Sequence, residues 1–233
     1  MQALKGIMAD FISLIYPRIC VACGSNLFGQ EQVLCTACSY QLPRVDNADF
    51  HNNKTGELFW GRIPVNYALS FFYYAKGSLY QNILHHLKYK KKQYIGLEMG
   101  RLFASEVKNK SLKGIDFIHA VPLHYKKLKK RGYNQSDLIA KGFSEVLNIP
   151  LISGEISRTE ATETQTSKGR YERWENVSGI FKIRRPDIFK NKHVLLIDDV
   201  ITTGATLEAC ANAILEIPGG QVSVASLALT RLG

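Results

Sequence analysis

The sequence predicts an α/β protein in which helices flank a mostly parallel sheet, joined to a small N-terminal module built around four cysteines. Strand-like apolar runs alternate with helical patterns from Val65 onward, an order typical of parallel sheets covered on both faces. Acidic and hydroxyl residues follow the apolar run at 194–197, at the edge where such sheets bind ligands. The third observation is a pair of C-x2-C motifs within the first 40 residues.

Size and charge limit the possible function classes. With 233 residues, 45% of them hydrophobic and 21% charged, the chain can bury one sizeable core and a small appendage. Its formal net charge of +10 attracts polyanions, so nucleic acids, phosphorylated metabolites and anionic lipids are candidate partners. Charge alone does not choose among them, because many basic proteins bind no nucleic acid.

The first residues predict neither a signal peptide nor a membrane span. The apolar run is short, contains Asp10, is followed by Arg18 and lacks a small-residue cleavage site. No stretch approaches the roughly 18 uninterrupted apolar residues that a span needs. We therefore expect a cytoplasmic protein that is not an integral membrane protein. A short amphipathic helix ahead of Pro17 either contacts the inner membrane peripherally or simply packs on the protein.

Four of the five cysteines form two pairs separated by eleven residues. Disulfides do not persist in a reducing compartment, so this spacing favours four thiolates around a structural Zn²⁺ over a redox pair or unrelated core cysteines. Four sulfur ligands would leave no open position for catalysis. The fifth, Cys210, lies in an apolar helical pattern and is expected to be inert core. The predicted zinc ligands are Cys20, Cys23, Cys35 and Cys38.

The remaining elements follow from hydrophobic period and turn residues. Residues 1–16 fit a helix, 17–40 the zinc ribbon and 41–62 a polar linker. The boundary between the N-terminal unit, 1–58, and the main domain, 59–233, is therefore placed in this stretch. The main domain is then expected to contain, in order, a strand at 65–74, helices at 79–87 and 94–107, a strand and loop at 116–123, a helix at 134–147, strands at 179–183 and 193–200, a helix at 206–217 and a strand at 221–230.

The segment 194–209 carries the clearest chemistry. Val194 to Ile197 form a strand, and Asp198 and Asp199 stand at its carboxyl end. The residues that follow supply hydroxyls and closely spaced N–H groups at a helix start, which suits a phosphate. They are Val200, Ile201, Thr202, Thr203, Gly204, Ala205 and Thr206.

Two carboxylates beside such a loop suit a ligand with a phosphate and a diol, held directly or through Mg²⁺. A sugar phosphate fits better than a nucleoside triphosphate, because the chain has no G-x4-G-K-[ST] motif. The alternative is an Asp-Asp N-cap on an ordinary strand-to-helix turn.

This segment resembles the phosphoribosyl pyrophosphate signature of type I phosphoribosyltransferases: an apolar strand, two acids, then T-T-G-x-T. The resemblance implies a type I phosphoribosyltransferase-like fold and a site that binds phosphoribosyl pyrophosphate with Mg²⁺. It also implies that Asp198 and Asp199, the catalytic pair, face the ribose hydroxyls, and that residues 202–206 hold the 5′-phosphate.

Three further stretches resemble the ComF family, also called GntX-like. A V-P-L loop with Pro122 and Leu123 precedes basic residues and an R-G-Y-N-Q run that starts at Arg131. The resemblance implies that this loop and Arg131 bind the pyrophosphate. An L-K-Y element contains Lys88. A polar segment matches the family's flexible loop over the ligand, at Gln165, Arg170, Arg173 and Asn176.

The basic run beside the V-P-L loop has two interpretations. Five cations in six positions suit a pyrophosphate or a nucleic-acid backbone, and nearby tyrosines could stack on bases. The alternatives are a solvated helix face and tyrosines buried with satisfied hydroxyls. The candidate nucleic-acid contacts are Lys88, Lys126, Lys127, Lys129, Lys130 and Arg131.

The resemblance to ComF proteins implies a competence function: assisting uptake of single-stranded DNA into the cytoplasm during natural transformation. A competence helicase or an inner-membrane channel is then the expected protein partner. A second hypothesis is a metabolic phosphoribosyltransferase that transfers ribose 5-phosphate to an unidentified nucleobase or amine. A ligand-sensing regulator is a third, less supported because no helix-turn-helix is evident.

Overall fold

The computed structural model describes residues 17–89, 92–108, 112–159 and 180–231. Its main sheet contains four parallel strands in the order β1-β6-β5-β2, as the strand and helix pattern predicted. A second, two-stranded antiparallel sheet pairs β3 with β4. The strands are β1 Ala68–Tyr74, β2 Phe117–Ala120, β3 Ile156–Arg158, β4 Phe181–Ile183, β5 His193–Ile201 and β6 Gln221–Thr230.

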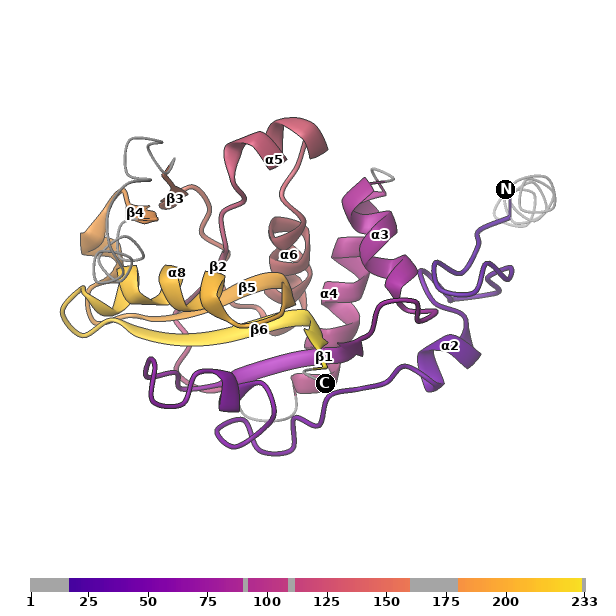
Figure 1. The fold of residues 1–233 in the computed structure, drawn as a ribbon, viewed down its shortest axis with the longest axis horizontal. Helices are drawn as coiled ribbons and strands as arrows, with labels where there is room; N and C mark the ends of the chain where they lie inside the picture. Colours follow the sequence, from indigo (N-terminus) through magenta and orange to yellow (C-terminus); the bar gives the residue numbers. More distant parts are fainter. Residues whose placement is uncertain (1–16, 90–91, 109–111, 160–179, 232–233) are drawn as a thin grey trace, which may run out of the picture.

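Helices connect and cover the parallel strands (Figure 1). Apart from β3, the short helices α2 and α5 and the two 3-10 turns, which the sequence analysis did not predict, each described element lies near its predicted position. The helices are α2 Thr36–Tyr40, α3 Gln81–Tyr89, α4 Gln93–Val107, α5 Tyr125–Arg131, α6 Gln135–Leu147 and α8 Ala205–Leu215, with 3-10 turns η1 Gly56–Leu58 and η3 Pro186–Phe189. The predicted helix at 1–16 and the polar segment at 160–179 lie outside the described residues.

The apolar strands separate two cores, because successive side chains point to opposite faces of the sheet. On β5, Leu195 and Ile197 face the core shared with α3, α4 and α6. Val194 and Leu196 face the second core, shared with α8 and η3. These four side chains are fully buried. A strand apolar on both faces is therefore the pattern that placed β5 in the sheet interior, where it holds the functional segment rigidly.

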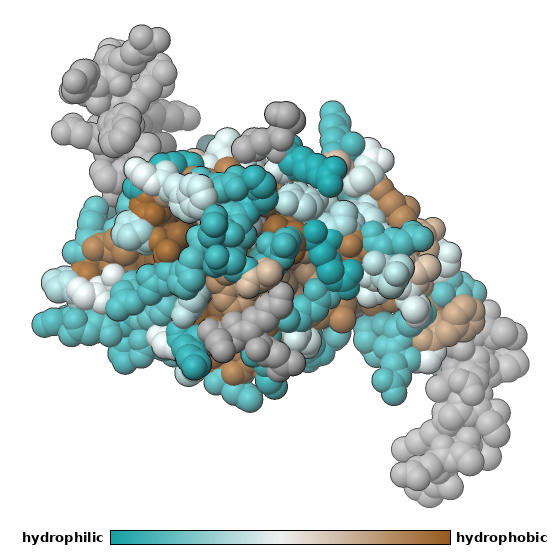
Figure 2. Space-filling model, turned by 90° about the horizontal axis from the view of Figure 1, so that it is seen from below, coloured by the Kyte–Doolittle hydropathy of each residue, from teal (hydrophilic) through white to brown (hydrophobic). Residues whose placement is uncertain are grey.

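The polar stretch 41–62, predicted to be a linker, is folded against the sheet. Val45 N donates to Phe71 O at 3.0 Å, and Ala68 N donates to Phe50 O at 3.1 Å. Phe59 is completely buried. In Figure 1 this segment runs below β1, and Figure 2 shows this face covered mostly by hydrophilic residues with hydrophobic patches between them. A few apolar anchors therefore fix a segment whose overall composition is polar; the domain boundary at residue 58 stays a prediction.

Within the described residues, no helix has the length and apolar character needed to cross a membrane.

Helices α4 and α6 approach each other through two glycines. A Cβ at Gly100 would lie 2.4 Å from the carbonyl oxygen of Ile139, and one at Gly142 would lie 2.4 Å from the carbonyl oxygen of Leu97. Such distances are far below van der Waals contact. The glycines therefore set the spacing of the helix pair that carries one face of the sheet.

We predict that Gly142→Ala lowers the free energy of unfolding by about 1–3 kcal/mol, because the added methyl group forces the two backbones apart. Urea unfolding followed by circular dichroism measures this change. The control is Lys141→Ala, one residue away and exposed on α6, which should change stability by less than about 0.5 kcal/mol. Equal stability of the two variants would contradict the close approach.

Candidate functional site

Two carboxylates stand at the carboxyl end of β5, as predicted. Asp199 is buried and pairs with Lys88 from α3, with 3.0 Å between Oδ2 and Nζ. Asp198 Oδ1 accepts hydrogen bonds from the Ser136 hydroxyl at 3.0 Å and from the Asp199 backbone N–H at 2.8 Å. The two neighbours therefore have different environments: one is matched by a cation, the other by neutral donors.

The environment of Asp198 changes its protonation. Burial, followed by the charge of Asp199, raises the pKa of the Asp198 carboxyl to about 7, against the opposing effect of its two hydrogen bonds. Close to neutral pH this carboxyl therefore exchanges its proton. A cation that approached the pair would favour the ionised form and give the site a second negative charge.

The residues after β5 form a loop suited to phosphate. Gly204 is the N-cap of α8 and has a φ of 80°, in the left-handed region that favours glycine. Thr202, Thr203 and Thr206 are exposed, so their hydroxyls are open to a ligand. The first N–H groups of α8 add donors and the positive end of a helix dipole. Hydroxyls, backbone donors and glycine thus meet beside Asp198 and Asp199.

Arg62 braces this loop, a contact that the sequence analysis missed. Its guanidinium donates to the carbonyl oxygen of Thr203 at 2.9 Å and forms an ion pair with Glu208 on α8. A Cβ at Gly204 would lie 3.1 Å from the ring of Phe59. Arg62 and Phe59 both lie within the stretch predicted to be a linker, so composition gave no sign of their position.

The R-G-Y-N-Q run is hydrogen-bonded to the V-P-L loop. Asn134 caps α6, and its amide donates to the carbonyl oxygen of Val121 at 3.0 Å. Arg131 donates to Gln135 Oε1 at 2.7 Å. The next residue, Ser136, reaches Asp198; its position directly after the motif was the only sequence signal for it. The motif therefore joins the loop at 121–124 to the carboxylates, with Pro122 and Leu123 only partly buried.

The same motif is joined to α3. The Tyr133 hydroxyl donates to the carbonyl oxygen of Leu87. The Arg131 guanidinium lies 5.7 Å from the centroid of the Tyr89 ring, within the range of cation–π attraction. Lys88 lies between Leu87 and Tyr89, so these contacts hold the lysine that pairs with Asp199.

The predicted nucleic-acid residues fall into two groups. Helix α5, which projects from the molecule at the top of Figure 1, has no buried residue. Lys88 instead has a partner in Asp199 and a mostly buried side chain. Exposed cations on a short helix suit a polyanion, whereas a paired lysine holds the carboxylates. The exposed cations of α5 are Lys126, Lys127, Lys129 and Lys130.

The four N-terminal cysteines form a cluster. Their sulfur atoms all lie within 4.8 Å of one another, and Cys23 Sγ is 3.7 Å from Cys35 Sγ. Hydrogen bonding to Ser25 lowers the pKa of the Cys23 thiol to about 6, whereas burial raises that of Cys38. Four sulfurs converging on one point fit a tetrahedral metal site. Cys210 lies apart, buried in α8.

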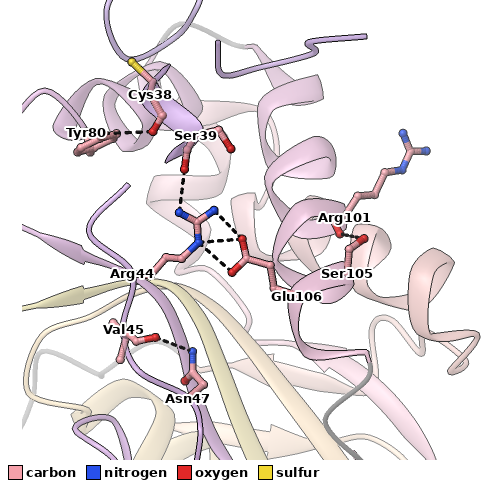
Figure 3. Close-up of polar contacts among 9 residues, drawn as sticks. All are labelled: Cys38, Ser39, Arg44, Val45, Asn47, Tyr80, Arg101, Ser105 and Glu106. Carbon is pink, nitrogen blue, oxygen red and sulfur yellow. Dashed lines mark hydrogen bonds and ion pairs between the residues drawn. The ribbon is translucent and has the colours of Figure 1, made fainter. Parts of the chain in front are cut away.

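Hydrogen bonds and an ion pair connect the cysteine cluster and the residues after it to the main domain (Figure 3). The Tyr80 hydroxyl donates to the carbonyl oxygen of Cys38 at 3.1 Å. Arg44 donates to the carbonyl oxygen of Ser39 at 2.7 Å and pairs with Glu106 on α4 at 2.8 Å. The module is thereby fixed against α4 and the start of α3.

A cavity of about 260 Å³ adjoins the carboxylates. It lies between α3 and the carboxyl ends of β1, β5 and β6, and Lys88 and Thr202 belong to both the cavity and the site described above. Sequence reasoning found no such pocket, because its walls come from four separate parts of the chain. The lining residues are Tyr74, Gln81, Leu84, His85, Lys88, Tyr89, Val200, Thr202 and Thr230.

The predicted flexible-loop residues lie outside the described part of the chain, so their place over the ligand stays a prediction. They are Gln165, Arg170, Arg173 and Asn176.

Comparison with known proteins identifies the domain that contains this site. A family model described as phosphoribosyl transferase domain matches residues 128–231. That range includes α6, both carboxylates, the phosphate loop and β6.

Three relatives share longer stretches of sequence. DNA utilization protein YhgH of Escherichia coli (strain K12) is 32% identical over 152 residues, which are 64% of this chain and 66% of that protein. Competence protein F of Haemophilus influenzae is 25% identical over 226 residues, 90% of this chain and 96% of that protein. Competence protein ComFC of Bacillus subtilis is 32% identical over 111 residues, 48% of this chain and 42% of that protein. The chain thus spans just under two-thirds of the E. coli relative, and with its phosphoribosyltransferase domain and four-cysteine cluster it belongs to the ComF family.

Proposed function

We propose that this protein is a ComF-type competence factor that assists the uptake of single-stranded DNA, and that its phosphoribosyltransferase site binds phosphoribosyl pyrophosphate with Mg²⁺. The observation that carries the ligand proposal is the meeting of Asp198 and Asp199 with the phosphate loop at 202–206. Carboxylates suit the ribose diol and Mg²⁺, while hydroxyls and N–H groups suit the 5′-phosphate. The loop at 121–124 and Arg131 lie on the β2 side, where the pyrophosphate would be held.

Mg²⁺ would supply charge neutralisation of the pyrophosphate. The residues of this chain would bind and orient the sugar. Asp198 and Asp199 accept from the ribose hydroxyls, and Lys88 forms an ion pair with the buried Asp199 carboxylate. Thr202, Thr203 and the start of α8 hold the phosphate.

The DNA proposal rests on α5 and on the relatives. The names Competence protein F and ComFC belong to proteins of this family, and the exposed cations of α5 provide a surface for a phosphate backbone. We further propose a cytoplasmic location, with peripheral contact at the inner membrane, and a competence helicase or membrane channel as the protein partner.

A second candidate is a metabolic phosphoribosyltransferase. The cavity beside Asp199 favours it, because an acceptor placed there would lie on the side of β5 opposite the loop that is proposed to hold the leaving pyrophosphate. Attack from the face opposite the leaving group is the geometry of an inverting displacement. Release of pyrophosphate that depends on an added nucleobase would favour this candidate.

Our prediction for the ligand site is that Asp198→Asn/Asp199→Asn lowers the affinity for phosphoribosyl pyrophosphate and Mg²⁺ by roughly 100-fold, since two charge-assisted contacts are lost. Calorimetric titration measures the affinity. Asp187→Asn, an exposed acid on η3, removes one charge at a distance and should leave it unchanged. Undiminished binding by the double variant would refute the assignment.

The pKa of Asp198 predicts a pH dependence. Ionisation of a carboxyl with a pKa of about 7 increases roughly tenfold from pH 6 to pH 8, and Mg²⁺ prefers the ionised form. The affinity for Mg²⁺ with phosphoribosyl pyrophosphate should therefore rise with pH over this window. In Asp198→Asn only the ionisation of the ligand itself should remain; identical slopes in both proteins would exclude Asp198 as the titrating group.

For the cysteine cluster we propose a structural Zn²⁺. Cys20→Ser should remove the metal, about one zinc ion per chain, and expose the backbone amides of residues 20–40 to hydrogen exchange. Elemental analysis and exchange mass spectrometry measure the two effects. Cys210→Ala, a cysteine outside the cluster, should retain the zinc. A metal-free protein with unchanged protection would contradict a structural role.

A further inference from the structure

The cavity beside Asp199 has the shape and surface for a flat ring. His85 and Tyr89 are exposed at its rim, with ring centroids 5.2 Å apart and planes inclined by 45°. Leu84 and Val200 add aliphatic surface. Its volume of about 260 Å³ is below the range of about 300–1,000 Å³ common for drug-sized ligands. One planar heterocycle is therefore the size of group that this space accommodates.

The walls also offer hydrogen bonds that the described residues leave unused. Thr230 Oγ1 is buried and has no hydrogen-bond partner among them. The Gln81 Oε1 atom accepts from the N–H of Gly77 at 2.6 Å, so the other end of this amide is a donor. A buried hydroxyl without a partner is unfavourable, and a polar ligand edge would remove that cost.

The charge of the lining favours a neutral ring over a protonated amine. None of the described residues that line the cavity carries a carboxylate, and Lys88 contributes a cation. The neighbouring Asp199 is already paired with Lys88. A protonated aliphatic amine would thus meet a cation without a free counter-charge, whereas a neutral ring with polar edges would not. These properties together describe a nucleobase.

The basic helix α5 ends beside the rim of the cavity. Arg131 is the last residue of α5 and its guanidinium lies 5.7 Å from the Tyr89 ring at the cavity rim. Helix α5 spans about 10 Å and exposes Lys126, Lys127 and Lys130 toward solvent. A phosphate backbone that followed these cations toward Arg131 would approach the rim. Cationic grooves combined with aromatic side chains are the usual means of binding single strands.

We infer that this cavity receives one base of a single-stranded DNA whose backbone lies along α5. The base stacks on Tyr89 with an edge against His85, and its polar edge bonds to Thr230 and Gln81. This inference rests on the proposed function, since it requires a strand at α5. It assigns the cavity to a base within a strand rather than to a free acceptor, because the rim is open and lies under Arg131.

The test compares two strands that differ only in their bases. Anisotropy titrations of the full-length, zinc-loaded protein would use a mixed-sequence 12-mer and a 12-mer of abasic sugars with the same phosphates. We expect Thr230→Val and His85→Ala to weaken binding of the normal strand roughly tenfold and to leave binding of the abasic strand unchanged. Because the Thr230 hydroxyl has no partner to lose among the described residues, Thr230→Val should not lower the melting temperature.

Thr55→Val is the matched control, because it removes a buried hydroxyl that donates to Ser70 Oγ at 2.9 Å. It should lower stability and leave both strand affinities unchanged. Calorimetric titration with phosphoribosyl pyrophosphate and Mg²⁺ checks that the Thr230 and His85 variants keep the neighbouring site intact.

Each alternative result would overturn the inference in a distinct way. If the variants weakened binding of both strands equally, or of neither, no base would enter the cavity. If strand binding were still lost in Lys126→Gln/Lys127→Gln, the proposed DNA function would remain supported. Absence of any strand binding by the unaltered protein would remove the proposed DNA function as well. Thr230-dependent binding of free adenine or uracil, with release of pyrophosphate, would assign the cavity to a metabolic acceptor.

Discussion

The ion pair between Lys88 and Asp199 is the interaction on which the arrangement of the site depends. Asp199 lies at the buried end of a strand that is apolar on both faces. A carboxylate in that position needs a nearby cation, because an unpaired buried charge is strongly unfavourable. The cation comes from α3, so the position of this helix is linked to the chemistry of β5. Tyr133 and Arg131 hold the same helix from its other side.

The cysteine module also contacts α3, at the start of the helix. Tyr80, directly before α3, donates to the carbonyl oxygen of Cys38, and Asn82, in its first turn, donates to that of Ala22 at 2.9 Å. A metal at the cluster would therefore order the loops that hold the start of α3, while Lys88 holds its end. Structural zinc stabilises what surrounds it. Such a metal would stabilise the start of α3, the helix that forms one wall of the cavity and carries Lys88.

Much of the fold could be predicted from the sequence, because its signals are local. The apolar run at β5, the acids after it and the glycine at the start of α8 are neighbours in the chain, so their spacing predicts strand, carboxylates and loop together. The cysteine spacing predicted the cluster for the same reason. In contrast, β3 pairs with β4 across the segment 160–179, and a three-residue strand has too little pattern to be recognised alone.

The site was less predictable, because its supporting contacts join distant parts of the chain. Arg62 reaches Thr203, and Ser136 reaches Asp198, but neither residue belongs to a motif that would indicate a role. Composition suggested a linker where Val45, Phe50 and Phe59 anchor the segment, since a few buried side chains are enough to fold a polar stretch. Lys88 was assigned to nucleic acid because it lies among other lysines. The structure gives it a carboxylate partner, and only the fold brings the two together.

This pairing also limits how a ligand can enter. Lys88 already contacts the Asp199 carboxylate. Mg²⁺ with a sugar diol would have to contact the same carboxylate, so it would compete with Lys88. Asp198, with its raised pKa, exchanges its proton near neutral pH, so the pair can accept a further cation without leaving a charge unmatched. If Lys88 yields Asp199 to the incoming ligand, its ammonium remains in the cavity lining, next to both the sugar site and the cavity. Movement of the Lys88 side chain would then couple ligand binding at the sugar site to ligand binding in the cavity. No helix needs to move for this, which agrees with the fixed attachment of α3 at both ends.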